Sequence, residues 1–194
     1  EKLVHGAFES LGYKAEIVPV ADVAAFQAGK EFGNNGQCNP TYFTVGNVVQ
    51  YLQRLEEQGM TKQDILDRYV FFTAGACGPC RFGMYEAEYR LALRNSGFDG
   101  FRVMLFQQGG GLNQAEAEAG LEMNLQFFLG ILNAMNMGDL INEVAYLIRP
   151  FELNKGETDA VLDDLMDFMQ GVMKRKKPWQ PTGWLAKVVN GRPG

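Results

Sequence analysis

The chain has 194 residues, a formal net charge of −5, and 46% hydrophobic against 21% charged residues. This composition is typical of a globular protein with its own core. The acidic balance argues against a general nucleic-acid binder, because neutralising phosphates needs a concentrated basic surface. No apolar stretch approaches the ~20 residues that a membrane helix needs. With a single histidine, His5, and only two serines, a histidine-based triad and serine hydrolase chemistry are poor fits.

The N-terminal part predicts a helix over residues 1–11 and a short strand over residues 15–20. Glycine, asparagine and proline are frequent over residues 29–40, which predicts an ordered turn region without regular structure. A helix is expected over residues 41–58, because its apolar residues recur at helical spacing. These residues are Val45, Val48, Val49, Leu52 and Leu55.

A second group of elements follows this helix. Thr61, with Asp64 three residues later, is typical of the N-terminus of a short helix. The β-branched and aromatic run at 69–73 predicts a buried strand. Residues 81–95 predict a further helix, and residues 101–106 predict a third strand. The order strand, helix, strand, helix, strand predicts an α/β fold, with a parallel sheet and helices on its faces.

We expect residues 1–111 to form this α/β core and residues 112–177 to form a helical part packed on the same domain. Residues 178–194 read as a linker or tail, which indicates a piece of a longer protein. The helical part is expected to break at three places. These are Gly138-Asp139, Arg149-Pro150 and residues 154–156.

Three cysteines carry the strongest functional signal: Cys38, Cys77 and Cys80. An odd number of cysteines in a chain that can bury its own core argues against a disulfide framework, and a reducing, cytoplasmic setting is expected. Cys38 follows the first predicted strand, Cys77 and Cys80 follow the second, and the glycines 109–111 follow the third. Because ligands bind at the carboxyl ends of parallel strands, we expect all of them at one edge of the sheet. Each cysteine also lies near a helix N-terminus, which favours thiolate.

Two chemistries fit these thiols. The first is thiol–disulfide exchange, because Cys77-Gly78-Pro79-Cys80 between a strand and a helix is typical of thioredoxin-like proteins. That interpretation gives Cys38 no role, and Ala76 stands where a tryptophan usually precedes the motif.

The second chemistry is a metal site with three thiolates. Zinc usually takes four protein ligands in structural sites, and His5 is a weak candidate for the fourth. An iron–sulfur cluster tolerates three cysteines better, because one iron can take water, substrate or a ligand from another chain. A structural metal in a scaffold module is a third alternative. The residues alone leave these alternatives open.

The segments around the cysteines are more specific than an isolated CxxC motif. Residues 33–43, GNNGQCNPTYF, and residues 75–85, GACGPCRFGMY, resemble the cysteine-containing region of the 2-hydroxyacyl-CoA dehydratase superfamily. The similarity is greatest to its large activase-related members and extends over residues 10–177. It implies a Rossmann-like domain that holds an iron–sulfur cluster on Cys38, Cys77 and Cys80.

The same resemblance implies low-potential electron transfer in an anaerobic metabolism. The cluster would be [4Fe–4S], or a double-cubane cluster as in some relatives. An ATP-hydrolysing activator would supply the electrons, and a second α/β domain or subunit would complete the site. The chain spans only one such domain and lacks the ATPase phosphate-binding segments. We therefore expect it to be one part of a reductase or dehydratase system.

Overall fold

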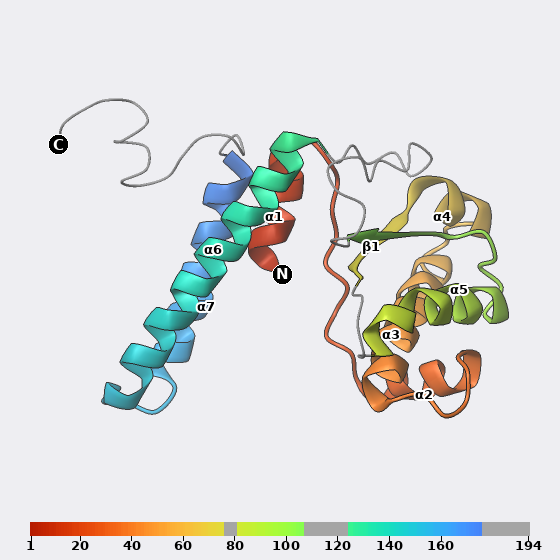
Figure 1. Ribbon diagram of the computed structural model, residues 1–194, viewed down its shortest axis with the longest axis horizontal. Coiled ribbons are helices and arrows are strands. Elements are labelled where there is room, and N and C mark those ends of the chain that lie inside the picture. Colours follow the sequence, from red (N-terminus) through yellow and green to blue (C-terminus); the bar gives the residue numbers. More distant parts are fainter. Residues whose placement is uncertain (76–80, 107–123, 176–194) are drawn as a thin grey trace. The chain divides into compact units, whose positions relative to one another are not determined.

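The computed structural model describes residues 1–75, 81–106 and 124–175 (Figure 1). The chain divides into two compact units, one of residues 18–121 and the other of residues 1–17 together with 122–194. Each unit has its own hydrophobic cluster. The candidate functional residues around Cys38 belong to the unit of residues 18–121, which is described first.

In the described parts of this unit, most residues are helical and one pair of strands is present. Its helices are α2 (Val23–Phe32), α3 (Asn39–Glu57), α4 (Lys62–Arg68), the 3₁₀ turn η1 (Arg81–Met84) and α5 (Tyr85–Asn95). Strands β1 (Val70–Ala74) and β2 (Arg102–Phe106) pair in parallel, with Val70 opposite Arg102 and Ala74 opposite Phe106. A parallel pair needs a crossover connection, and α5 lies in that connection.

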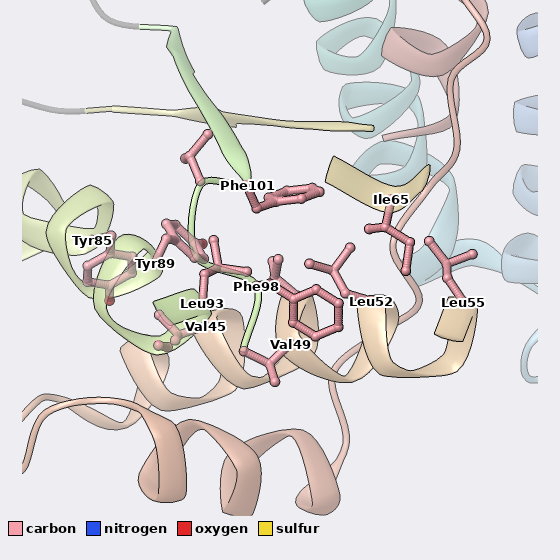
Figure 2. Packing of buried hydrophobic residues seen from close by; sticks show 13 residues of the cluster. Val45, Val49, Leu52, Leu55, Ile65, Tyr85, Tyr89, Leu93, Phe98 and Phe101 are labelled. Atoms are coloured by element: carbon pink, nitrogen blue, oxygen red, sulfur yellow. The ribbon is translucent and has the colours of Figure 1, made fainter. Parts of the chain in front are cut away.

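The core of this unit lies between α3, α4, α5 and the turn before β2. Figure 2 shows the labelled side chains of these elements gathered around Phe98. Phe98, Val49 and Ile65 are fully buried there. The helical spacing of the valines and leucines in α3 is the reason for this arrangement, because it places them on one face of the helix.

Helices α2 and α3 approach each other closely at two glycines. A Cβ atom at Gly46 would lie 1.8 Å from the carbonyl oxygen of Ala25, and one at Gly29 would lie 2.0 Å from that of Tyr42. Neither glycine has a positive φ, so both are required for space and not for backbone conformation. The missing side chains let the two helix backbones come into contact, and the segment that contains Cys38 connects these two helices.

The other unit joins α1 (Lys2–Ser10) to the C-terminal helices α6 (Leu125–Ile148) and α7 (Glu157–Arg175), which are separated by the 3₁₀ turn η4 (Arg149–Phe151). Helix α1 contacts both long helices. Leu3 and Ala7 pack against Ala134 and Ile141 of α6 and against Met173 of α7. Ion pairs of Lys2 with Asp167 and of Lys174 with Glu9 join α1 to α7.

The predicted Rossmann-like α/β fold is wrong. Helices hold 69% of the described residues, and the sheet has only two strands there. The first predicted strand, residues 15–20, is absent. Pro19 has no N–H to donate to a neighbouring strand, and Val20 is 94% exposed, so this segment buries no apolar face. The apolar residues of this segment therefore do not indicate a strand.

The turn region predicted over residues 29–40 is wrong at both ends. Helix α2 continues to Phe32, because Gly29 lies where α3 crosses, and α3 already begins at Asn39. Pro40 lies in the first turn of α3, where its missing N–H costs no hydrogen bond. The predicted break at Gly138-Asp139 is also wrong, because α6 runs through it.

Other local predictions are confirmed. Thr61 caps α4, accepting a hydrogen bond from the N–H of Asp64 at 3.1 Å. The strand predicted at 69–73 corresponds to β1, whose bounds differ by one residue. Both remaining predicted breaks are present: α6 ends just before Arg149, and the residues before Glu157 are not helical. Among the described residues, no helix is both long enough and apolar enough to span a bilayer.

Candidate functional site

Cys38 lies at the start of the longest helix of its unit. It is the N-cap residue of α3, with an extended backbone at φ −71° and ψ 150°, and its carbonyl accepts a hydrogen bond from the N–H of Thr41 at 3.0 Å. The prediction that Cys38 directly precedes a helix is confirmed. Free N–H groups and the positive end of the helix dipole at this position favour a negative charge on sulfur.

Two hydroxyl groups contact the sulfur of Cys38. Its Sγ atom lies 3.0 Å from Thr41 Oγ1 and 3.4 Å from the hydroxyl of Tyr85. The side chain of Thr41, then that of Tyr85, then the backbone N–H of Thr41 lower the pKa of Cys38 to about 7. A thiolate at this position is therefore formed near neutral pH while its side chain stays only partly buried.

The segment before Cys38 is held by side chains from two helices. The carboxylate of Glu88 in α5 accepts hydrogen bonds from the Asn34 N–H at 3.2 Å and from the Gln37 side chain at 2.9 Å. The hydroxyl of Tyr42 in α3 accepts one from the Gln37 N–H at 3.0 Å and donates one to the Asn34 carbonyl at 3.2 Å. The turn that precedes the thiol is thus fixed at both ends.

Cys77 and Cys80 lie outside the described residues, as do the glycines 109–111. The residues on either side are described: Gly75 donates a hydrogen bond to the Phe106 carbonyl at 2.8 Å, and η1 begins with Arg81, directly after Cys80. The predicted convergence of three sulfur atoms stays a prediction. Within the ranges 1–75, 81–106 and 124–175, no three His, Cys, Asp or Glu side chains are grouped to hold a metal ion.

His5 has its described contacts within its own unit. It lies in the other unit, where Nε2 is 2.8 Å from the Ala15 carbonyl oxygen and Nδ1 is 2.8 Å from the side-chain nitrogen of Gln170. Both ring nitrogens thus have partners that join α1 to its own turn and to α7. These contacts give His5 a structural role.

The sequence analysis missed Thr41, Tyr85 and Glu88. Thr41 has a local signal, because a hydroxyl three residues after an N-cap residue can reach it. Tyr85 and Glu88 have a weaker one: they are three residues apart on the helix that follows Cys80, and therefore share a face. Their partners are 47 to 54 residues away in the sequence, so no local pattern pairs them.

The arrangement fits a soft metal or a redox group. Metal centres with thiolate ligands need a deprotonated sulfur, and outer hydrogen bonds orient and tune that sulfur. Cys38 has both properties: its pKa is lowered to about 7, and two hydroxyl groups can donate to the thiolate. An iron–sulfur cluster or zinc could use this ligand.

Cys38 in the metal-free protein is expected to react with iodoacetamide with a half-maximal rate near pH 7, where its pKa lies. The pKa of Cys38 in the folded protein is below its unfolded value of ~8.5. Ionisation of Cys38 therefore stabilises the folded state fully above pH ~8.5, and this stabilisation is lost as the pH falls through about 7. Trypsin places Cys38 in residues 31–54 and the other two cysteines in residues 69–81, so mass spectrometry reads them separately. A midpoint at the unfolded value would contradict the hydrogen bonds to the sulfur.

Comparison of the chain with models of protein families, with curated proteins and with solved structures gave no match. The resemblance to the 2-hydroxyacyl-CoA dehydratase superfamily therefore stays a prediction, carried by the residues around Cys38 and the CGPC segment.

Proposed function

We propose that this chain is an iron–sulfur cluster-binding electron-transfer domain with Cys38, Cys77 and Cys80 as ligands. One observation supports this most: the sulfur of Cys38 lies 3.4 Å from the hydroxyl of Tyr85, the first residue of the helix α5. Only the four residues of η1 separate Tyr85 from Cys80 in the sequence. A contact between the Cys38 segment and the chain just after the CGPC motif is what a shared site requires.

Thr41 and Tyr85 would serve such a site directly. When bound, an iron–sulfur cluster supplies one-electron transfer at a potential set by its surroundings. The two hydroxyl groups donate hydrogen bonds to a ligand sulfur, which reduces its negative charge and raises the potential. Tyr85 is buried and packs edge-on against Phe82 with ring centroids 5.0 Å apart, so its hydroxyl is held in place.

The system around this domain follows from the resemblance. An ATP-hydrolysing activator would reduce the site, a second domain or subunit would complete it, and the system would act in the cytoplasm. If the complete system is a dehydratase, the resemblance implies that a 2-hydroxyacyl-CoA is reduced by one electron to a ketyl radical, which then loses water. The proposal rests on the cysteines and their neighbours and makes no use of a Rossmann-like sheet.

A thiol–disulfide oxidoreductase is the second candidate. It is favoured by the parallel pairing of β1 with β2, because the CGPC segment then lies between a strand and the helix of one crossover connection. That position is typical of dithiol motifs in thioredoxin-like proteins. In this interpretation Cys38 takes no part in the chemistry.

Anaerobic preparation and metal analysis test the proposal. Reconstitution with iron and sulfide is expected to give about four of each per chain, with a brown charge-transfer absorption. Stoichiometric zinc in place of iron would instead support a structural-metal scaffold. Protein that takes up neither metal and forms a reversible bond between Cys77 and Cys80 would support the oxidoreductase.

A further inference from the structure

One face of α5 contacts the segment that leads to Cys38 over its whole length. Three of its side chains make these contacts: Tyr85 with Cys38 Sγ, Glu88 with Asn34 and Gln37, and Asn95 with the Phe32 carbonyl at 2.6 Å. Their spacing places them on one face of the helix, with the buried Ala92 between them. Helix α5 therefore supplies the side chains that hold this segment in place.

Glu88 is the unusual member of this set. Its carboxylate belongs to a residue that is only 7% exposed, and charged side chains are rarely this buried unless they are paired. Each oxygen accepts one N–H, Oε2 from the Asn34 backbone and Oε1 from the Gln37 side chain. Such charge-assisted hydrogen bonds are roughly twice as strong as neutral ones.

The residues that Glu88 binds are the ones that direct the chain into α3. Gly36 has a φ of +81°, so the turn between Asn34 and Gln37 adopts a conformation that favours glycine. Gln37 directly precedes Cys38. Any movement of this turn would move the Cys38 sulfur relative to Tyr85, because the two are on different elements.

We propose that Glu88 is a positioning residue for Cys38: its buried carboxylate fixes the turn of residues 34–37 on α5 and so holds the Cys38 sulfur against the hydroxyl of Tyr85. The inference deepens the proposed function, because it names the group that sets the geometry of one ligand sulfur. Glu88 acts through the turn and does not itself touch the sulfur in any hydrogen bond found among the described residues.

The test measures alkylation of Cys38 by iodoacetamide at about pH 7 on the full, metal-free chain, with peptide 31–54 read by mass spectrometry. Glu88→Ala is expected to slow it about three- to tenfold, as Tyr85→Phe does, since the net contribution of one typical intramolecular hydrogen bond corresponds to roughly that factor. If Glu88 acts through the contact between Cys38 and Tyr85, the variant that combines Glu88→Ala with Tyr85→Phe is alkylated no more slowly than the slower of the two single variants. Glu86→Ala is the matched control, because Glu86 is on the same helix and pairs with Arg90 at 2.9 Å on the exposed side.

Glu88→Gln is a milder second variant in case Glu88→Ala folds poorly, because glutamine keeps one acceptor oxygen. We expect its alkylation rate at Cys38 to lie between those of the wild type and Glu88→Ala. Hydrogen exchange of the Asn34 amide should speed up in both variants. If Cys38 in Glu88→Ala is alkylated at a rate within twofold of the wild-type rate, or faster, the proposal is overturned. The hydrogen bonds of Tyr42 would then be what holds the turn of residues 34–37. Since no iron is present, this result is separate from the iron-binding test: either can fail while the other succeeds.

Discussion

Gly46→Ala is expected to destabilise the unit of residues 18–121 by about 3 kcal/mol or more, at the upper end of what overpacking costs. The new Cβ atom would lie 1.8 Å from the Ala25 carbonyl oxygen and 2.4 Å from the Gly29 nitrogen. Both are backbone atoms of α2, so no change of side-chain rotamer relieves the clash. The two helices would have to separate, and the buried face of α3 would lose its packing. Urea unfolding followed by circular dichroism measures the loss.

Gly138→Ala is the matched control. Gly138 is also inside a helix, but its nearest neighbour for a new Cβ is Leu3 Cδ1 at 3.8 Å, which is an ordinary contact. Because alanine favours the helix over glycine by about 1 kcal/mol, this variant should be at least as stable as the wild type. Equal losses for both variants would contradict this explanation, because helix propensity favours alanine at both positions and Gly138 has no close backbone neighbour.

These glycines also explain where prediction from the sequence failed. The period of Val45, Val48 and Val49 predicted α3 correctly, because a helical core face is a local pattern. Gly29 was assigned to a turn region, since glycine lowers helix propensity. What keeps it helical is contact with Tyr42 in the next helix, and that contact is a tertiary property.

The predicted strand at 15–20 failed for a related reason. A short apolar segment forms a strand only when one of its faces is buried against another element. Val20 is 94% exposed and Pro19 has no N–H to donate, so this segment has neither a buried face nor a complete set of ladder hydrogen bonds. Among the described residues, the second and third predicted strands pair as β1 and β2, and only the first is missing from the predicted order.

The site was predictable in its cysteine and not in the groups around it. Cys38 was placed before a helix by the proline and glycines of its segment, and the structure has it as the N-cap of α3. Thr41 is within reach of Cys38 in the local sequence, whereas Tyr85 and Glu88 approach this segment only because α5 packs against it. These neighbours determine how strongly the thiolate is favoured, so the chemistry of the site depends on tertiary contacts that the motif alone does not contain.

Cys38→Ser is expected to abolish iron uptake and the associated absorption in anaerobic reconstitution. Serine keeps nearly the same size and can still bond Thr41, but at neutral pH its hydroxyl stays protonated and cannot replace a soft thiolate ligand. The loss should therefore come without unfolding, which circular dichroism checks. Atomic absorption and sulfide analysis measure the bound iron and sulfide.

Tyr85→Phe is the control for this experiment, because it removes a hydrogen bond to the same sulfur and leaves the ligand itself in place. It should retain iron and shift the reduction potential downward, since a donor to the ligand sulfur has been removed. A Cys38→Ser protein that binds as much iron as the wild type would contradict the three-thiolate proposal. If the same variant also keeps a reversible bond between Cys77 and Cys80, the CGPC motif works without the third sulfur, as the oxidoreductase interpretation requires. The two candidate functions therefore differ in whether the sulfur at the start of α3 is needed, and one atom exchanged at that position decides between them.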